Sequence, residues 1–392
     1  MIVIGAPQLN VEDRRSVVQV ALRHRGESVP LWFAVEPEWA RHLTTEQSDS
    51  FLLGLLPSIM QMREDVHVEG VVSERLFYHL THHVMRILSV MFPHLKPVKL
   101  TADRLNAMPL RQLPGGVVTG FSAGIDSFCV FADYLFGDVS DGYRITHAIT
   151  NNVGAHGRLD NARELFGHRY ERYRPLMQQW RLPFLKVDSN LHVLVRPGEG
   201  RFPQPGLTGT HTFRNTAAVL MLQKLFARYL YASCFPYELC RVRQTNNIGH
   251  VDPVLDHLLS TESTECLAVG SEYTRVQKTE RVAGVPGSFQ YLDVCCKKLP
   301  RKNCSVCPKC TRTLLTLDLL GRLEDYAPVF DLEKYRRIRQ RCLVEAAAAD
   351  DDDFLCEIVQ AYRERGQALP AWCRAAGKLG LKRLWPGKRS LK

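Results

Sequence analysis

The 392-residue chain lacks any uncharged apolar run near the roughly 18 residues that would cross a bilayer. The first six residues are apolar, but Glu12, Asp13, Arg14 and Arg15 follow without the apolar core or small-residue cleavage site of a signal peptide. Internal repeats and low-complexity linkers are missing too. These absences exclude a membrane-spanning or secreted protein, so we expect a globular cytoplasmic one.

Disulfides are not expected although the chain has 12 cysteines, because a large chain without a secretion signal keeps its thiols reduced. The cysteines indicate metal ligands or buried thiols, and their spacing decides between the two. A net charge of +10 favours an anionic ligand or a nucleic acid. The excess is spread along the chain and partly gathered from Lys378 to Lys392, so a solvated basic face is the simpler interpretation.

The first 110 residues indicate an accessory α+β domain. Strands are predicted near residues 2–4, 17–22 and 30–35, and two helices follow. Ser73 is a natural N-cap for the second helix. Apolar residues recur on it at helical spacing, at Phe77, Leu80, Val84, Ile87 and Val90. His79 and His83 lie one turn apart, and a polar helix face is a simpler interpretation of them than a metal site.

Strands and helices alternate from about residue 113 to 320. Strands are predicted at 117–121, 144–150 and 184–187. Helices are predicted at 128–136, from the N-cap Asn161 to a stop or kink before Pro175, and at 215–231. Apolar residues on nearly every side of the last helix indicate that it is buried. The pattern predicts an α/β fold, in which helices cover both faces of a parallel sheet and ligands bind at the carboxyl ends of strands.

The last 75 or so residues predict a helical extension that ends in the basic tail. Asp331 can cap a helix that runs to about Ala349. The run from Asp350 to Asp353 interrupts it, and a solvated loop is a simpler interpretation of these acids than a cation site. We therefore expect three parts, at residues 1–110, 111–315 and 316–392.

The segment from Gly115 to Ser127 is the most informative part of the chain. It reads Gly-Gly-Val-Val-Thr-Gly-Phe-Ser-Ala-Gly-Ile-Asp-Ser, a β-branched run that leads into a turn of small residues. A buried strand, this turn and a helix starting near Ser127 would aim free backbone N–H groups and the helix N-terminus at one point. An anion is the expected ligand.

Residues 122–127 resemble the Ser-Gly-Gly-x-Asp-Ser signature of the PP-loop ATP pyrophosphatase superfamily, whose members cleave ATP between the α- and β-phosphates. The resemblance implies that the backbone and both serines hold the leaving pyrophosphate and that the aspartate helps to organise Mg²⁺. It implies catalytic roles for Ser122, Asp126 and Ser127. The implied ATP-binding loop consists of Phe121, Ser122, Ala123, Gly124, Ile125, Asp126 and Ser127.

Ala123 departs from this signature, because the superfamily usually has glycine there. If the position needs a positive φ, alanine costs on the order of 1 kcal/mol. Two other interpretations of the segment remain. Gly120 to Gly124 also fits the Gly-x-Ser-x-Gly elbow of α/β-hydrolases, but no histidine follows His257 to complete a triad. A plain glycine-rich turn is the second alternative.

Four cysteines near the end of the predicted core form a second motif. Cys296, Cys304, Cys307 and Cys310 have the spacing C-x7-C-x2-C-x2-C, with Cys295 as a substitute for Cys296. Four thiolates this close in sequence can surround Zn²⁺, which contributes on the order of 10 kcal/mol to a local fold. A ferredoxin-type cluster is less favoured, since position 314 is leucine. Coincidental buried thiols are the third alternative.

The two motifs together are similar to those of the 7-cyano-7-deazaguanine synthase family, over about residues 115–313. That family adenylates 7-carboxy-7-deazaguanine and converts the activated acid to an amide and then a nitrile. The resemblance implies substrate contacts at Arg214, Asn215 and Asp252, and an ionised aspartate can accept the donors of a guanine-like edge.

The chain departs from the family at residues 154–157, where Gly-Ala-His-Gly stands in place of a Gly-Gln-Arg-His type segment. The flanking parts of the chain also have no counterpart in the short biosynthetic enzyme. We therefore expect a divergent relative, of the kind that occurs in antiviral operons.

The resemblance implies an ATP-dependent ligase. ATP and a 7-deazaguanine-type carboxylate would give an acyl adenylate and pyrophosphate, and ammonia or an amine on a protein partner would displace AMP. The implied cofactors are ATP, Mg²⁺ and Zn²⁺, a homodimer is one expected assembly, and no membrane partner is expected. One alternative is a tRNA-modifying PP-loop enzyme with Cys129 and Cys234 as sulfur carriers, although their apolar surroundings favour inert thiols. The other is a non-catalytic nucleotide-binding zinc protein.

Overall fold

The computed structural model describes residues 1–110, 115–157, 161–196, 202–203, 206–296, 302–367 and 369–378. Two features predicted from the sequence fall outside this description, namely the side chain of Asn161 as an N-cap and residues 379–392 of the basic tail. No helix among the described residues combines the length and hydrophobicity that a membrane span requires.

The chain divides into two compact units. The first unit contains Met1–Ser122 and Asp133–Glu272, and the second contains Ala123–Ala132 and Tyr273–Lys392. The second unit therefore includes a short piece of the central sequence, at the start of the helix that follows Ser122. The division into three parts at about residues 110 and 315 stays a prediction. The two compact units have different boundaries from those parts.

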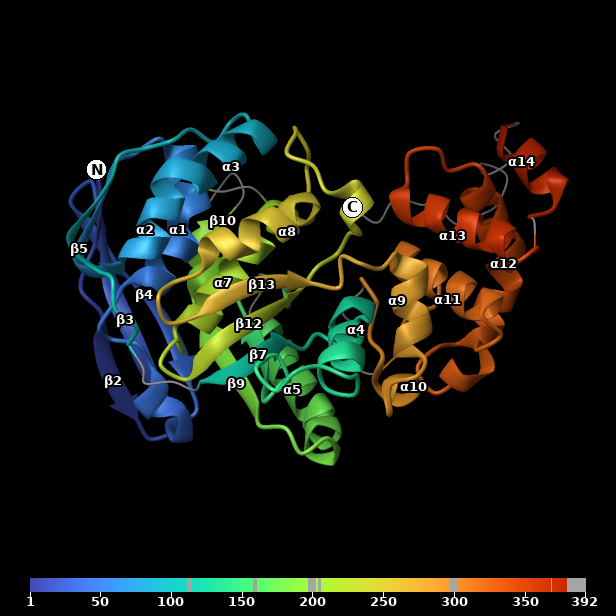
Figure 1. Ribbon diagram of the computed structural model, residues 1–392, viewed down its shortest axis with the longest axis horizontal. Coiled ribbons are helices and arrows are strands. Elements are labelled where there is room, and N and C mark those ends of the chain that lie inside the picture. The colour runs from blue at the N-terminus through green and yellow to red at the C-terminus, as the bar shows by residue number, and fades with distance from the viewer. Residues whose placement is uncertain are drawn as a thin grey trace. The chain divides into compact units, whose positions relative to one another are not determined.

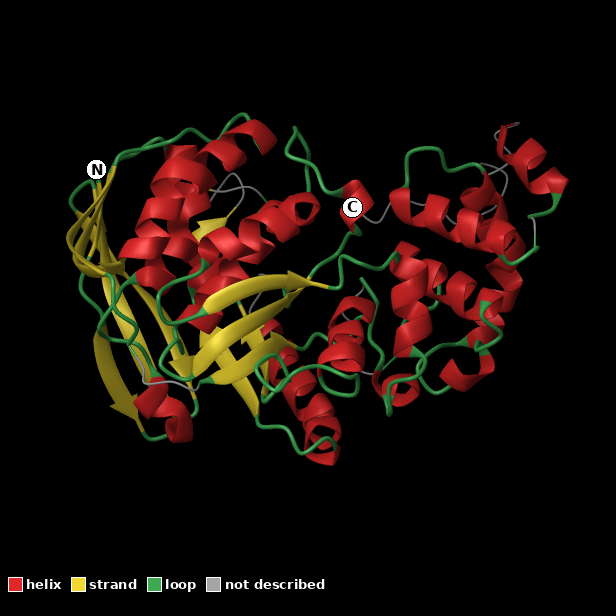
Figure 2. Cartoon of the chain, in the orientation of Figure 1, coloured by secondary structure: helices red, strands yellow, loops and turns green. Residues whose placement is uncertain are grey.

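The first unit has an α/β fold built on one sheet, as predicted, in which eleven strands of the described residues take part (Figures 1 and 2). These strands are β1 (Ile2–Ile4), β2 (Gln8–Glu12), β3 (Arg15–His24), β4 (Glu27–Val35), β5 (Val66–Ser73), β6 (Leu100–Asn106), β7 (Gly116–Gly120), β8 (His147–Asn152), β9 (Phe184–Ser189), β12 (Phe226–Ala232) and β13 (Glu265–Val269). Their order across the sheet is β13-β12-β7-β8-β9-β4-β3-β1-β5-β6, and β2 pairs with β3. A separate pair joins β10 (Val195–Arg196) and β11 (Phe202–Pro203).

The five strands from β13 to β9 are all parallel. Their order reverses between β7 and β12, because the chain winds from β7 outward through β8 to β9 and then returns to the other side of β7. In an open sheet of this kind, ligands bind outside the carboxyl ends of the strands at the point of reversal. Ser122 follows β7 at that position.

The N-terminal strands continue the same sheet. β4 pairs antiparallel with β9, with Phe33 opposite Ser189 and Ala34 opposite Asp188. β3 then pairs with β4 and β1, also antiparallel, and β1 begins a short parallel group with β5 and β6. The first 110 residues thus share a hydrophobic core with the central strands.

The helices of the first unit pack against this sheet and against each other. They are α1 (Asp49–Met62), α2 (Glu74–His79), α3 (Met85–Met91), α5 (Asn161–Gln179), α6 (Leu191–Leu194), α7 (His211–Leu220) and α8 (Asp252–Leu255), while α4 (Ile125–Tyr134) runs from the second unit into the first. α1 packs against α7, and α5 lies against β8 and β9. α5 continues through Pro175, where the sequence predicted a stop or kink.

The helix predicted after Ser73 forms, and the Ser73 hydroxyl accepts a hydrogen bond from the Leu76 N–H at 3.0 Å. A π-helical turn from Leu80 to Val84 separates α2 from α3. The extra residue of this turn shifts the apolar stripe, so that Leu88 and Met91 are buried while the side chain of Val90 is 51% exposed. The predicted stripe therefore holds as far as Ile87, which packs against the core, and is wrong at Val90.

The predicted helix at 215–231 is wrong in its second half. α7 ends at Leu220, and residues 226–232 form β12, which pairs with β7 and β13 (Figure 1). A strand covered on both faces is apolar without alternation, so its sequence is indistinguishable by periodicity from that of a buried helix.

The second unit consists of helices and the loops between them, with no strand among its described residues (Figure 2). Besides the start of α4, it contains α9 (Arg275–Val282), α10 (Ser288–Tyr291), α11 (Pro308–Leu319), α12 (Leu332–Ala347), α13 (Asp353–Glu364) and α14 (Ala371–Lys378). Asp331 caps α12 by accepting from the Lys334 N–H at 3.1 Å, as predicted. Asp352 caps α13, so the acidic run restarts the helical structure.

Asp49 ties three parts of the first unit together from a fully buried position at the start of α1. Its Oδ1 accepts from the Ser73 N–H at 2.8 Å, and its Oδ2 accepts from Gln223 Nε2 at 2.9 Å. Burial raises the pKa of Asp49 to about 6, although both hydrogen bonds oppose the rise. The folded state therefore holds the Asp49 proton more tightly than the unfolded chain does.

We predict that this carboxyl makes the protein less stable as the pH rises from about 4 to 7. The proton bound in the folded state is lost through this window, and the full effect is roughly 3 kcal/mol at about 1.4 kcal/mol per pKa unit. The measurement is the free energy of urea unfolding against pH for the wild type and for Asp49→Asn. The difference between the two should carry this slope, and parallel curves would contradict the assignment.

Candidate functional site

The candidate loop (residues 121–127) joins β7 to α4 through a left-handed turn. Ala123 is fully buried and has a φ of +56°. This conformation costs alanine on the order of 1 kcal/mol and favours glycine. The position is the one at which the PP-loop signature has glycine, so this chain makes a glycine-type turn with a less suitable residue.

Hydrogen bonds fix the loop from Ala123 onward. The Gly124 carbonyl accepts from the Phe128 N–H and from the Ser127 hydroxyl, both at 3.0 Å, and the Ala123 carbonyl accepts from the Asp293 N–H at 2.7 Å. Ser127 is buried, whereas Ser122 is exposed. The two predicted catalytic serines therefore differ, since Ser127 is buried and its hydroxyl donates within the turn, whereas Ser122 is an exposed residue.

Two cations of α9 face Asp126 within the second unit. Asp126 Oδ1 lies 2.8 Å from Arg275 Nη1 and 3.2 Å from Lys278 Nζ. The Lys278 side chain is only 1% exposed, so its charge depends on this partner. Burial alone would raise the pKa of Asp126, but the two cations outweigh it and lower the pKa. The carboxylate is therefore ionised at neutral pH.

Sequence reasoning missed Arg275 and Lys278, although a local signal was present. Thr274 and Gln277 form a capping box that marks the start of α9. A cation at the first helical position and another three residues later must share one helix face. What the sequence could not give was the partner, because Asp126 and Lys278 are 152 residues apart in the chain.

The residues implied as substrate contacts lie in the first unit. Arg214 and Asn215 are in α7, where Arg214 is buried and donates through Nη1 to the Val153 carbonyl at 3.1 Å. Asp252 is fully buried at the start of α8, and its Oδ1 accepts from the Thr212 hydroxyl at 2.9 Å. Asn215 is partly exposed. Arg214 and Asp252 are thus held by protein groups in this conformation.

Gly154 lies in the segment that departs from the family pattern, after the carboxyl end of β8. Its φ is +123°, and a Cβ atom there would come within 2.5 Å of Arg214 Nη1. Glycine is therefore required both by the backbone conformation and by the close approach of the guanidinium.

A buried Tyr–His pair accompanies the predicted residues of α7 and was not predicted. His211 Nδ1 lies 2.6 Å from the Tyr231 hydroxyl, at the end of β12. Burial and the nearby carboxyl groups of Asp252 and Asp256 raise the pKa of Tyr231 well above its ordinary value. The phenol of Tyr231 therefore stays protonated at neutral pH and can donate to His211 Nδ1.

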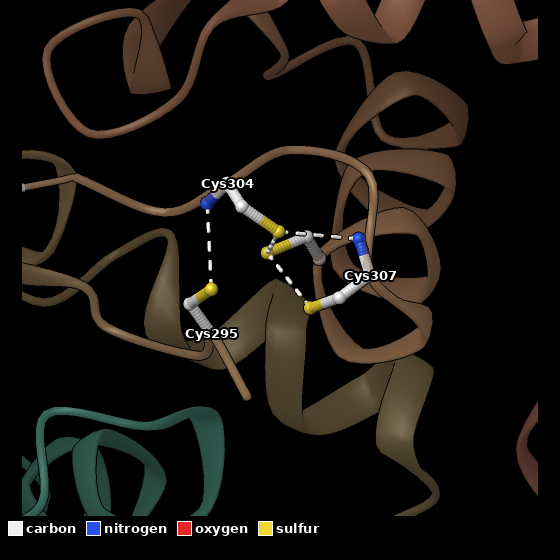
Figure 3. A group of neighbouring side chains, drawn as sticks. Cys295, Cys304 and Cys307 are labelled. Carbon is white, nitrogen blue, oxygen red and sulfur yellow. Dashed lines mark hydrogen bonds between the residues drawn. The ribbon is translucent and has the colours of Figure 1, made fainter. Parts of the chain in front are cut away.

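Four cysteines of the second unit form a group that could hold a metal ion, and three of them are those predicted from the sequence (Figure 3). The sulfur atoms of Cys295, Cys304, Cys307 and Cys310 lie within 4.8 Å of one another. Cys310 Sγ is 3.9 Å from Cys304 Sγ and 3.4 Å from Cys307 Sγ. Four sulfurs at about 2.3 Å from Zn²⁺ form a tetrahedron with edges of about 3.8 Å, so the group fits zinc.

The structure selects Cys295 as the fourth member of this group. The spacing predicts Cys296 there with Cys295 as the substitute, but Cys296 is exposed and is not one of the four cysteines grouped within 4.8 Å. The Cys296 thiol lies beside Cys307, at the edge of the group. The Cys304 N–H donates to Cys295 Sγ at 3.4 Å and supports this arrangement.

Comparison of the chain with protein-family models, curated proteins and solved structures finds no match. The assignment of a function therefore depends on the residues of this chain and on the resemblance of its motifs.

We predict that Cys295→Ser loses bound zinc and that Cys296→Ser keeps it. Losing one of four thiolates opens the tetrahedron and lowers both zinc affinity and the stability of the surrounding fold. The measurements are zinc content by elemental analysis and the melting temperature with and without a chelator. Equal zinc content in the two variants would contradict the selection of Cys295.

We also predict that Ala123→Gly changes stability by less than about 1 kcal/mol, because relief of the left-handed strain offsets the loss of a buried methyl group. Ala123→Val should be destabilised by at least about 2 kcal/mol, since a β-branched residue strongly resists a positive φ. Ala218→Val is the matched control, with the same added volume at a buried helical position. Urea unfolding measures the stability of all three variants. Equal losses of unfolding free energy in Ala123→Val and Ala218→Val would show that the positive φ of Ala123 is not the cause.

Proposed function

We propose that the protein is an ATP-dependent ligase of the PP-loop type, which adenylates a carboxylate of the 7-deazaguanine class and transfers the acyl group to an amine. The observation that carries this proposal is the left-handed turn at Ala123. It lies between a central parallel strand and a helix, after the strand at which the sheet order reverses, and at the position where the signature has glycine. Together these features match what the PP-loop resemblance implies for this turn.

The chemistry requires the substrate carboxylate to attack the α-phosphorus of ATP while pyrophosphate leaves. Backbone N–H groups of the candidate loop and the exposed Ser122 hydroxyl are suited to donate to the phosphate oxygens. Arg275 and Lys278 supply positive charge to offset the charge that builds on the leaving group. An amine then attacks the acyl carbon, and AMP departs with its pair of electrons as the amine loses a proton.

The residues present also fit the two metals. Mg²⁺ is commonly held by one or two carboxylates together with phosphate oxygens, and Asp126 offers an ionised carboxylate in the candidate loop. Bound there, Mg²⁺ would neutralise charge on the phosphates. Zn²⁺ held by Cys295, Cys304, Cys307 and Cys310 would join the segment before α11 to its first turn, which is a structural role.

Two alternatives receive less support. A sulfur-transferring tRNA enzyme needs reactive thiols, and Cys129 is buried in α4 while Cys234 is half-buried. The second alternative is a nucleotide-binding protein without activity, in which Ala123 in place of the signature glycine would mark the loss of catalysis. Because Ala123 adopts the left-handed conformation, the substitution gives no geometric reason for lost activity.

We predict that the protein, with ATP, Mg²⁺ and 7-carboxy-7-deazaguanine, forms AMP and pyrophosphate in an acid-dependent manner. Formation of ADP, or turnover that ignores the acid, would reject the proposal. Lys278→Met should lower kcat by about 100-fold or more, as expected when one group that stabilises the transition-state charge is removed. Lys334→Met is the matched control, because Lys334 is an exposed partner of Asp331 on α12 and should leave kcat unchanged.

A further inference from the structure

α13 belongs to the helical C-terminal extension predicted from the sequence and packs against α9. Glu357 Oε2 accepts a hydrogen bond from the Arg275 N–H at 2.6 Å, at the first residue of α9. Further along both helices, Arg365 forms an ion pair with Glu280 at 3.0 Å. α13 is therefore attached to α9 at two points, and one of them is the residue that faces Asp126.

The Arg275 side chain also contacts α13. Its guanidinium carbon lies 5.0 Å from the centroid of the Phe354 ring, within the range of a cation–π interaction. Arg312 of α11 lies 4.9 Å from the same centroid and forms an ion pair with Asp352, the N-cap of α13. The Phe354 ring is thus held by a second arginine that is itself fixed to the start of α13.

These contacts constrain Arg275 in two ways. Glu357 fixes the backbone of Arg275, and Phe354 restricts its side chain. Arg275 in turn shares Asp126 Oδ1 with the buried Lys278. Without α13, Arg275 would lose the backbone and side-chain contacts that hold it beside Asp126.

We infer that α13 is a positioning element for the proposed ATP site, in which Phe354 and Glu357 hold Arg275 against Asp126. The inference rests on the proposed function for its effect on catalysis, while the coupling of α13 to Asp126 does not depend on it. The C-terminal extension is then part of the catalytic unit, and damage to α13 should impair ATP use without removing any group that touches ATP.

The test compares Phe354→Leu and Glu357→Leu with two control variants on the same helix, Tyr362→Leu and Glu364→Gln. We expect kcat for ATP consumption to fall by roughly 10-fold to 100-fold in the first pair, because misplaced catalytic groups lose rate steeply. Phe354→Tyr should keep a rate close to that of the wild type, because tyrosine retains the aromatic ring that contacts Arg275. Loss of rate in both pairs alike would indicate general loosening of α13 and overturn the inference.

A second readout separates positioning from loss of structure. Arg275 is proposed to offset charge on the leaving group, so its displacement in Phe354→Leu should lower kcat with little change in the KM for ATP, and Tyr362→Leu should change neither. A KM for ATP that rises in Phe354→Leu while kcat stays unchanged would count against positioning.

The inference can fail separately from the proposed function. If the wild type consumes no ATP, the ligase proposal fails, and thermal unfolding of Phe354→Leu, Asp126→Asn and the double variant still tests the coupling. Non-additive effects on stability support a connection from α13 through Arg275 to Asp126. Additive effects overturn it.

Discussion

The ion pairs of Asp126 with Arg275 and Lys278 are the interaction on which the candidate site depends. A buried ammonium such as Lys278 is costly unless a carboxylate lies close to it, and a carboxylate in the same place is costly without the cations. If α4 and α9 moved apart, Lys278 would therefore be left as a buried charge without its carboxylate partner. The pairing joins the first turn of α4 to the first turn of α9 and accounts for a compact unit made of distant segments.

The other contacts of the second unit reinforce the same arrangement. Asn303 accepts from the Val294 N–H at 2.8 Å and donates to the Leu292 carbonyl at 2.9 Å, so it clamps the two sides of the cysteine segment. The Asp293 N–H, beside this clamp, donates to the Ala123 carbonyl. The cysteine group and the left-handed turn are thus separated by only a few residues of chain and one hydrogen bond, which gives the metal-binding motif a direct structural link to the candidate loop.

The sequence predicted features that arise from local chemistry. The strand, turn and helix around Ala123, the caps at Ser73 and Asp331 and the close group of cysteines follow from residue types at short spacing. Features that depend on distant partners were not accessible. The cations facing Asp126 and the β12 strand, read as helix, required knowledge of what packs against them, and the π-helical turn after Leu80 has no clear sequence signal. The implied substrate residues Arg214 and Asp252 were placed by resemblance alone, and their buried hydrogen bonds could not be foreseen.

The antiparallel pairing of β4 with β9 has a consequence for how the chain can be divided. The flank of β9 away from β8 would otherwise present unpaired N–H and C=O groups beside an apolar sheet, which is a template for intermolecular strand pairing. β4 occupies the last two positions of this flank, at Asp188 and Ser189. Removing the first 110 residues would therefore lengthen the open edge of the central strands and favour their pairing with other molecules.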